Sequence, residues 1–508
     1  AGVEDCRGQS AAGGRRRLQE TGGGSRAAHT PMRRDRALCL SLLLLATLLL
    51  SSRHWWQRSD VRRVAAPFLI SLSDAHARAH LPSLDALPEL IPDGVRLHDA
   101  AWARKDWRVP EEAAALTALL YDVERTVAYS AIPPQMRRKL EASGRAPHRF
   151  AVQQCVTIGG RFLSSEALSF NRVRSLRFTH AAPKGAEARG GHAAAEAGEG
   201  VEVAAPRQRE LVESLDQQSC QPADLCDPLN WTMADASIGY LQNERAVAFA
   251  NMGRVTALHG VVVARHVRSP LRLKSSDLRG MFALAHAWFL AARAAHGAAA
   301  TFPTLSFDSL RTGGASMLHP HLQTRLGRRR YAGKWQGVRD GAARYAELTG
   351  RPYHQDVAAA HAFLGLHFVR TDHFVGYLSL TSAGAAAQVE IVGDTRAEEL
   401  LSSARGATLA VELGAVFYRV LRAAHAELGW DGFSASCALP PLDGGGPGGM
   451  PWICRMVGRG SYDSVVSDIS ANELFELPVV PIDLVDAASR LRRYLLSVGL
   501  SAADRSDA

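Results

Sequence analysis

The residues whose types and spacing could do chemistry lie in one segment, Gly-Gly-Ala-Ser-Met-Leu-His-Pro-His-Leu-Gln at positions 313–323. His319 and His321 would point to the same face of an extended strand, and Pro320 between them stiffens the backbone. A neutral imidazole, with a reference pKa of about 6.5, is a competent nucleophile near neutral pH. This spacing therefore predicts a histidine that attacks phosphorus, and His321 is the candidate.

The neighbours of the two histidines suit an anionic phosphoryl group. Adjacent glycines, Gly313 and Gly314, let the backbone approach a bulky anion and present its N–H groups. Ser316 adds a hydroxyl donor. Gln323 lies on the same strand face as His321, where its amide can donate to a phosphoryl oxygen as charge grows there. A bare His-x-His is more often a surface loop, so these neighbours are what favours the catalytic interpretation.

This pattern resembles the galactose-1-phosphate uridylyltransferase family of the histidine-triad (HIT) superfamily, which includes relatives that act as nucleotide phosphorylases. Gly314-Ala315-Ser316 and His319-Pro320-His321-Leu322-Gln323 match the family's Gly-x-Ser-x-x-His-Pro-His-x-Gln pattern position by position. Weaker support comes from a strand at 259–266 that ends in a histidine, and from the segments 452–459 and 473–492.

The resemblance implies a ping-pong reaction that moves a nucleoside monophosphate from a nucleotide sugar to a sugar 1-phosphate. His321 would attack the α-phosphorus and form a nucleotidyl-histidine intermediate, and the backbone carbonyl of His319 would orient its ring. Ser316 and Gln323 would bind the transferring phosphoryl group. The further substrate-binding candidates are Gly314, Ala315, Asp308 and Arg311.

Two alternative functions stay open at the level of the sequence. In the first, the same chemistry serves a nucleotide-sugar or dinucleotide phosphorylase, in which inorganic phosphate is the acceptor. In the second, the chain is a catalytically weakened nucleotide-binding protein. Asp308 motivates this last reading, because it stands about where many family members have asparagine and would repel a phosphate unless protonated or paired with Arg311. The histidines expected after residues 389–391 and at Ile453 are also missing.

Family members often hold zinc with a Cys-x-x-Cys pair and two histidines. In this chain Cys220 and Cys226 are six positions apart. The resemblance implies that His266 and His319 serve as the histidine ligands, with Cys226 and Cys220 completing a tetrahedral zinc site. The alternative is that the two cysteines are ordinary thiols or a disulfide.

The hydrophobic periodicity predicts an α+β fold in which strands followed by a long amphipathic helix occur twice. The resemblance implies that these two repeats are HIT-like halves, each with an antiparallel sheet. In the first half we expect strands at 246–251, 259–264 and 304–307, and a helix from Ser275 or Ser276 to Gly297. In the second half we expect strands at 374–380, 388–392, 452–457 and 479–482, a helix over 397–428 with a break at Gly406, and a terminal helix over 484–496.

These elements divide the chain into regions. A leader that includes a signal peptide or signal anchor covers 1–58, and an N-terminal extension covers 59–149. The first half covers 150–350, with a flexible insertion at 181–206 that is rich in alanine, glycine and glutamate. The second half covers 351–496, and a tail covers 497–508.

The charge balance indicates the kind of ligand to expect, and a segment near the N-terminus indicates the location of the protein. Lysine and arginine outnumber aspartate and glutamate by 59 to 50 in 508 residues, which suits phosphate-bearing ligands but falls short of a nucleic-acid-binding composition. The seven cysteines are too sparse for a disulfide scaffold. Basic residues precede an apolar run at 37–50, which predicts a cleaved signal or a membrane anchor at 37–52.

We therefore expect the protein in the endoplasmic reticulum or Golgi, in the lumen or on the membrane, or in an organelle reached through them. If the leader is artefactual, the expected location is the cytoplasm. We also expect a homodimer.

Overall fold

The computed structural model describes residues 81, 83–90, 110–163, 166–172, 206–218, 225–384, 386–393, 403–444, 449–460, 462, 471–475 and 478–498. The predicted leader, the membrane anchor at 37–52, most of the insertion at 181–206 and Cys220 lie outside these residues. Within them, no helix is both long enough and apolar enough to span a bilayer.

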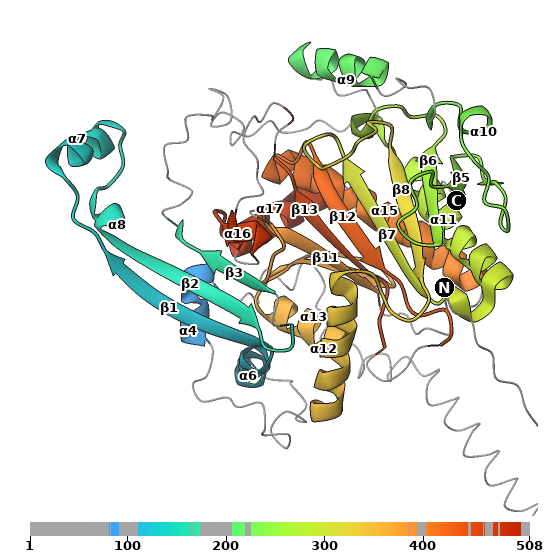
Figure 1. The fold of residues 1–508 in the computed structure, drawn as a ribbon. Helices are drawn as coiled ribbons and strands as arrows, with labels where there is room; N and C mark the ends of the chain where they lie inside the picture. The colour runs from blue at the N-terminus through green and yellow to red at the C-terminus, as the bar shows by residue number, and fades with distance from the viewer. Residues whose placement is uncertain are drawn as a thin grey trace, which may run out of the picture. The chain divides into compact units, whose positions relative to one another are not determined.

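Ten strands of the described residues form one sheet in the order β4-β5-β6-β8-β7-β12-β13-β11-β10-β9 (Figure 1). Every neighbouring pair in this sheet is antiparallel. In chain order the strands are β4 (Leu241–Gln242), β5 (Ala246–Ala250), β6 (Leu258–Ala264), β7 (Phe302–Ser309), β8 (His321–Gly327), β9 (His367–Arg370), β10 (Phe374–Leu378), β11 (Gln388–Gly393), β12 (Phe433–Ala438) and β13 (Ile453–Gly458).

The strand order reveals two halves that meet at the centre of the sheet. The first half contributes β4, β5, β6, β8 and β7, and the second contributes β12, β13, β11, β10 and β9, so the second order is the reverse of the first. A long helix follows the first strands of each half: α11 (Ser275–His296) in one and α15 (Ser403–Leu428) in the other. The predicted α+β fold, with two antiparallel halves that each carry a long helix, is therefore confirmed.

The apolar stripe predicted for α11 is buried. Leu278, Phe282, Ala285 and Phe289 are each at most 2 % exposed. The helix packs on α15 and on strands β5, β6 and β8. It ends at Gly297 as predicted, where a φ of 54° is a conformation that favours glycine.

Two details of these helices differ from the prediction. The N-cap of α11 is Lys274, not Ser275 or Ser276, because the carboxylate of Asp277 accepts the Lys274 N–H at 3.0 Å and fixes the start of the helix there. The break predicted at Gly406 is also wrong, since α15 continues through this residue. A single glycine costs a helix only about 1 kcal/mol, which the packing of α15 on α11 outweighs.

The two faces of the large sheet have different roles. A Cβ on Gly260 of β6 would lie 2.8 Å from the Trp288 ring on α11, so this residue and its partner on β8 face the helices. Because side chains alternate along a strand, the residues next to that partner face the opposite side. His321, Gln323 and Arg325 of β8, which lie one or three positions from that partner, are therefore on this opposite side.

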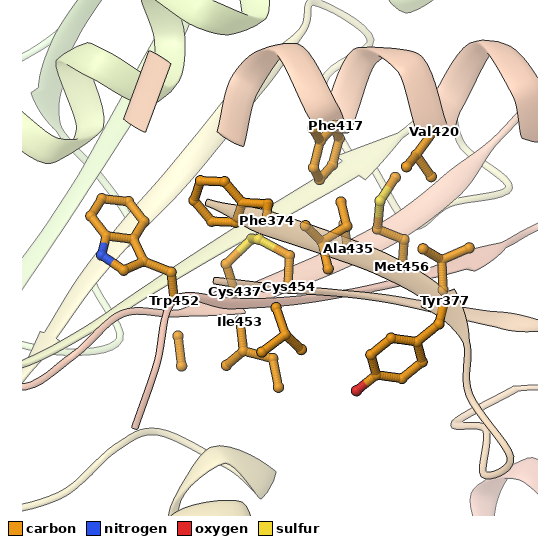
Figure 2. Close-up of a cluster of buried hydrophobic side chains, with 14 of the residues drawn as sticks. Phe374, Tyr377, Phe417, Val420, Ala435, Cys437, Trp452, Ile453, Cys454 and Met456 are labelled. Carbon is orange, nitrogen blue, oxygen red and sulfur yellow. A yellow bond between two sulfur atoms is a disulfide. The ribbon is translucent and has the colours of Figure 1, made fainter. Parts of the chain in front are cut away.

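The helix-facing side of the second half forms a close-packed core (Figure 2). Phe417 of α15 lies over Phe374 and Met456 of the strands, next to a disulfide between Cys437 and Cys454. The two cysteines lie directly opposite each other on β12 and β13, with a Cα–Cα distance of 4.0 Å. Strand register therefore brings together two cysteines that are 17 positions apart in the sequence.

A second sheet has the order β1-β2-β3-β14, and the sequence patterns did not predict most of it. Its strands are β1 (Tyr121–Tyr129), β2 (Val152–Gly160), β3 (Ala167–Phe170) and β14 (Val479–Val480), the last being the strand expected at 479–482. The remaining α-helices of the described residues are α4 (Leu87–Leu90), α6 (Pro110–Leu120), α7 (Pro134–Ala142), α8 (His148–Ala151), α9 (Pro206–Gln218), α10 (Pro228–Trp231), α12 (Lys334–Thr349), α13 (Tyr353–Phe363), α16 (Ala471–Leu474) and α17 (Leu484–Ser497).

Candidate active site

His321 begins β8 on the side of the sheet opposite α11, and only 8 % of its surface is exposed. Its Nδ1 donates to the backbone carbonyl of His319 at 2.8 Å, which is the contact that the resemblance implies. Because a carbonyl can only accept, the proton sits on Nδ1 and the lone pair of the neutral ring sits on Nε2. Nε2 has no hydrogen-bond partner among the described residues and retains some contact with solvent.

The surroundings of His321 keep its ring neutral. Burial lowers the pKa of His321 below its ordinary value, while the carbonyl of His319 and the charge of Asp308 oppose that shift. Burial prevails, so the ring carries a free lone pair at pH 7. A neutral imidazole with one accessible nitrogen is the form that can attack phosphorus.

Gln323 lies two residues further along β8, on the same side as His321. Its Oε1 accepts from Nη2 of Arg325 at 2.8 Å and lies 3.1 Å from Nε2 of His259. Its amide nitrogen has no hydrogen-bond partner in the described part of the chain. The side chain is thus free to donate toward a ligand near His321.

Asp308 lies half-buried on β7, and burial raises its pKa above the ordinary value. Ser434, its neighbour on β12, and the cations of Arg459 and Arg325 act against that rise. Arg311, the partner considered from the sequence, is not among the groups that shift this pKa. The second half therefore supplies the serine and one of the arginines beside Asp308.

The glycine-bearing loop between β7 and β8 is a tight turn. A Cβ on Gly313 would clash with the carbonyl oxygens of Ser309 and Phe433, so only glycine fits there. Gly314 has a φ of 91°, which also favours glycine. The N–H groups of Gly314 and Ala315 already donate within the turn, each at 3.0 Å.

The backbone of this turn differs in part from the expectation that its N–H groups would be presented to a phosphate. Since the N–H groups of Gly314 and Ala315 are used within the loop, they hold the loop in shape and are not presented to a ligand. Ser316 is exposed and makes no hydrogen bond in the described structure, so its hydroxyl remains available. The contacts predicted between these three residues and a substrate stay predictions.

The residues predicted to hold zinc come together only in part. Nε2 of His319 donates to the backbone carbonyl of Ala264 at 2.7 Å, and its Nδ1 lies 3.4 Å from Sγ of Cys226. Cys226 takes part in a disulfide, and zinc binds the thiolate, not an oxidised sulfur. His266 is exposed and contacts the carbonyl of Glu244 at 3.0 Å instead.

No three His, Cys, Asp or Glu side chains among the described residues form a group that could hold a metal ion. With Cys226 oxidised, these residues do not fit zinc. Metal binding at His266, His319, Cys226 and Cys220 stays a prediction, and it applies to a reduced form of the chain.

Sequence reasoning missed several residues of the site. Arg325 could have been found, because it continues the period-two spacing of His321 and Gln323 on one strand face. His259 and Ser434 reach the site from neighbouring strands, and strand pairing cannot be read from the local sequence.

Comparison with known proteins finds no matching family model and no matching curated protein. Among solved structures, the chain is similar to an ADP-glucose phosphorylase from Arabidopsis thaliana, with 14 % identity, a TM-score of 0.46, and coverage of 67 % of this chain and 97 % of that chain. It is also similar to a GalT-like protein from Arabidopsis thaliana, with 16 % identity, a TM-score of 0.43, and coverage of 55 % and 93 %. A third similar structure is a uridylyltransferase, with 13 % identity, a TM-score of 0.41, and coverage of 52 % of this chain and 88 % of that chain.

Proposed function

We propose that this protein is a nucleotidyltransferase that moves a nucleoside monophosphate from a nucleotide sugar to a sugar 1-phosphate through an intermediate on His321. The observation that carries the proposal is the state of the His321 ring. Its Nδ1 is tied to the His319 carbonyl at 2.8 Å, its pKa is lowered by burial, and its Nε2 lone pair is free.

In the first step, Nε2 of His321 attacks the α-phosphorus of the nucleotide sugar. An N–P bond forms, the bond from phosphorus to the bridging oxygen breaks, and the sugar 1-phosphate leaves with the electron pair. The ring gains positive charge, which the His319 carbonyl and the carboxylate of Asp308 stabilise. The amide of Gln323 and the guanidinium of Arg325 would offset the charge on the phosphoryl oxygens.

In the second step, a phosphate oxygen of the acceptor sugar 1-phosphate attacks the same phosphorus. The N–P bond breaks, its electron pair returns to Nε2, and the neutral His321 is restored. Dividing one displacement into two in this way lets a single nucleophile serve both directions of the exchange.

Trapping the intermediate tests this proposal. Incubating the protein with uridine, guanosine and adenosine sugars labelled at the α-phosphate should leave acid-labile, base-stable label on His321, and His321→Ala should remove it. Failure of all these sugars to label the wild-type protein would contradict the proposal and favour the nucleotide-binding protein without catalysis.

The same labelled protein separates the transferase from the phosphorylase. Release of label by sugar 1-phosphates, with a nucleotide sugar as product, supports the transferase. Release by inorganic phosphate alone, with a nucleoside diphosphate as product, identifies the phosphorylase that uses the same first step.

We also propose that the protein resides in the secretory pathway. The disulfide between Cys437 and Cys454 supports this, because such bonds persist in oxidising compartments and are rare in the cytosol. Localising a tagged protein that starts at Met32 tests it, and a cytosolic signal would overturn it. We further propose that the protein is a homodimer. Light scattering of the purified protein tests this, and the mass of a single chain would overturn it.

A further inference from the structure

His259 lies on β6, directly beside β8, and only 2 % of its surface is exposed. It is the strand partner of Arg325, so both side chains face the side of the sheet that carries Gln323. A buried histidine next to the residue expected to bind the phosphoryl group is not used in the reaction proposed above. Its contacts show what it does.

Three polar groups surround the ring of His259. The backbone N–H of Val255 lies 3.2 Å from Nδ1. Nε2 lies 3.1 Å from Oε1 of Gln323 and 3.2 Å from Nδ2 of Asn251. The loop between β5 and β6 supplies Val255 and Asn251, so it holds the ring from one side.

These contacts decide which nitrogen of His259 carries the proton. The Val255 N–H can only donate, so Nδ1 accepts and the proton is on Nε2, from where it donates to Gln323 Oε1. This tautomer satisfies two of the three contacts. The opposite one would satisfy only Asn251 and would set two N–H groups against each other at Nδ1.

The ring of His259 is also neutral. Burial lowers the pKa of His259, and the charges of Arg325 and Arg254 lower it further, against a weaker opposing effect of Gln323. A second proton would have to sit on Nδ1, where it would face the N–H of Val255.

Two donors therefore converge on one atom of Gln323. His259 Nε2–H approaches Oε1 at 3.1 Å, and Arg325 Nη2 approaches it at 2.8 Å. The terminal amide of a glutamine has a broad, roughly two-fold rotational preference, so an unheld amide would also present its oxygen to the ligand. With Oε1 held, the NH2 group is the end that faces away from the two donors.

We infer that His259 is a positioning residue for nucleotidyl transfer, which fixes the amide of Gln323 so that its NH2 group donates to the transferring phosphoryl group. This inference rests on the proposed function. Without His259, Gln323 would present a carbonyl oxygen to an anionic phosphoryl oxygen part of the time, and the transition state would lose a donor.

Removing the Nε2–H donor tests the inference. His259→Phe keeps a ring of similar size, and we expect single-turnover labelling of His321 to slow by about tenfold to hundredfold, since one such donor contributes about 10²–10³ in rate. The Kd for the nucleotide sugar should change by less than about threefold, because the donor acts mainly as charge develops. His259→Gln, whose amide nitrogen can replace Nε2, should restore labelling to within about threefold. His148→Phe, at an exposed position of α8, is the matched control and should label at the wild-type rate.

A double-mutant cycle separates positioning from packing. If His259 acts through Gln323, then His259→Phe should have less than about a twofold effect in a Gln323→Ala background. The same loss in both backgrounds, or no loss in either, would overturn the inference. In that case wild-type labelling of His321 would still support the proposed function.

The tautomer itself can be measured in the unaltered protein, which keeps the test decisive if His259→Phe does not fold. Nitrogen NMR of protein labelled in its histidines, with the signal of His259 assigned by its loss in His259→Gln, should show a protonated Nε2 and an unprotonated Nδ1. A protonated Nδ1 would overturn the inference. Absence of label on wild-type His321 would overturn the proposed function instead.

Discussion

Strand β8 of the first half and strand β13 of the second half hold equivalent places in the reversed strand order. Their side chains differ, because those of β8 line the candidate site and those of β13 are buried in the core and in ion pairs. β8 starts at His321, whereas β13 starts at Ile453, which is 1 % exposed and packs in the core. Two residues further on, Gln323 opens toward the candidate site, whereas Arg455 lies in a closed cluster of charges.

In the closed cluster of the second half, Arg455 has an ion-pair partner on each of two carboxylates. Arg455 forms ion pairs with Glu166, which precedes β3, and with Glu390 of β11, the latter at 3.2 Å. Glu390 also accepts from the hydroxyls of Tyr377 at 3.0 Å and Ser379 at 3.3 Å. These carboxylates raise the pKa of Arg455 against the effect of its burial.

The first half lacks such closure. Nε2 of His321 and the amide nitrogen of Gln323 have no hydrogen-bond partner among the described residues. One backbone arrangement can therefore carry either a candidate active site or a buried cluster of ion pairs. A few side chains at alternate strand positions decide which.

The largest expected difference between the halves concerns their first strand residues. His321→Ala should lower nucleotidyl transfer by about 10⁴-fold or more, because the nucleophile is gone, with little change in stability. Ile453→Ala should leave the rate per folded molecule within about twofold, but it should lower the free energy of unfolding by about 2–5 kcal/mol through the cavity it creates. Single-turnover kinetics and denaturant unfolding of both variants measure this. A large rate loss in Ile453→Ala would mean that the second half takes part in catalysis.

The next contrast concerns Gln323 and Arg455. Arg455→Met should lower the free energy of unfolding by about 3–5 kcal/mol, because Glu166 and Glu390 would remain buried without their cation. Gln323→Ala should change stability by less than about 1 kcal/mol and slow transfer by about 10²–10³-fold. Single-turnover kinetics and denaturant unfolding of these two variants measure this contrast. Equal stability losses at the two positions would contradict the contrast between an open and a closed half.

The smallest effect concerns Asp308, the carboxylate beside the candidate nucleophile. Asp308→Asn should lower the KM for a nucleotide sugar by about threefold to tenfold, because a negative charge near the phosphate is removed. It should also move the acid limb of the rate profile to lower pH. Neutral His321 is the active form, so activity falls as the pH drops through its pKa, and Asp308 raises that pKa.

Rate profiles of the wild type and of Asp308→Asn measure this prediction, with Asp340→Asn at an exposed position of α12 as the control. An acid limb that moves to higher pH would show that Asp308 does not stabilise the charged form of His321.

Local patterns predicted the repeated part of the fold well. The stripe from Leu278 to Phe289 and the alternating strand at 388–392 each carry a period that fixes the element type. β12 was missed because its sequence, Phe-Ser-Ala-Ser-Cys-Ala, is built of small residues with weak strand preference. Of the second sheet only β14 was expected, and its pairing with β3, which lies far away in the sequence, depends on tertiary contacts that local patterns do not show.

In the candidate site too, sequence analysis found the residues that lie close together in the sequence and missed those that other strands supply. His321, Gln323 and the His319 carbonyl lie within five residues, so spacing alone placed them together. His259 and Ser434 belong to other strands, and their approach depends on strand register. The disulfide between Cys437 and Cys454 likewise follows from register, which a count of cysteines cannot reveal.

The pairing of β7 with β12 has a consequence for how the two halves exist. These central strands hydrogen-bond to each other from Phe433 opposite Ser309 to Ala438 opposite Thr304. If the halves were produced separately, each would present a bare row of backbone donors and acceptors, an edge that invites aggregation. We therefore expect the two halves to fold as one cooperative unit, so that the half with the candidate nucleophile His321 depends on the half that has Ile453 in its place.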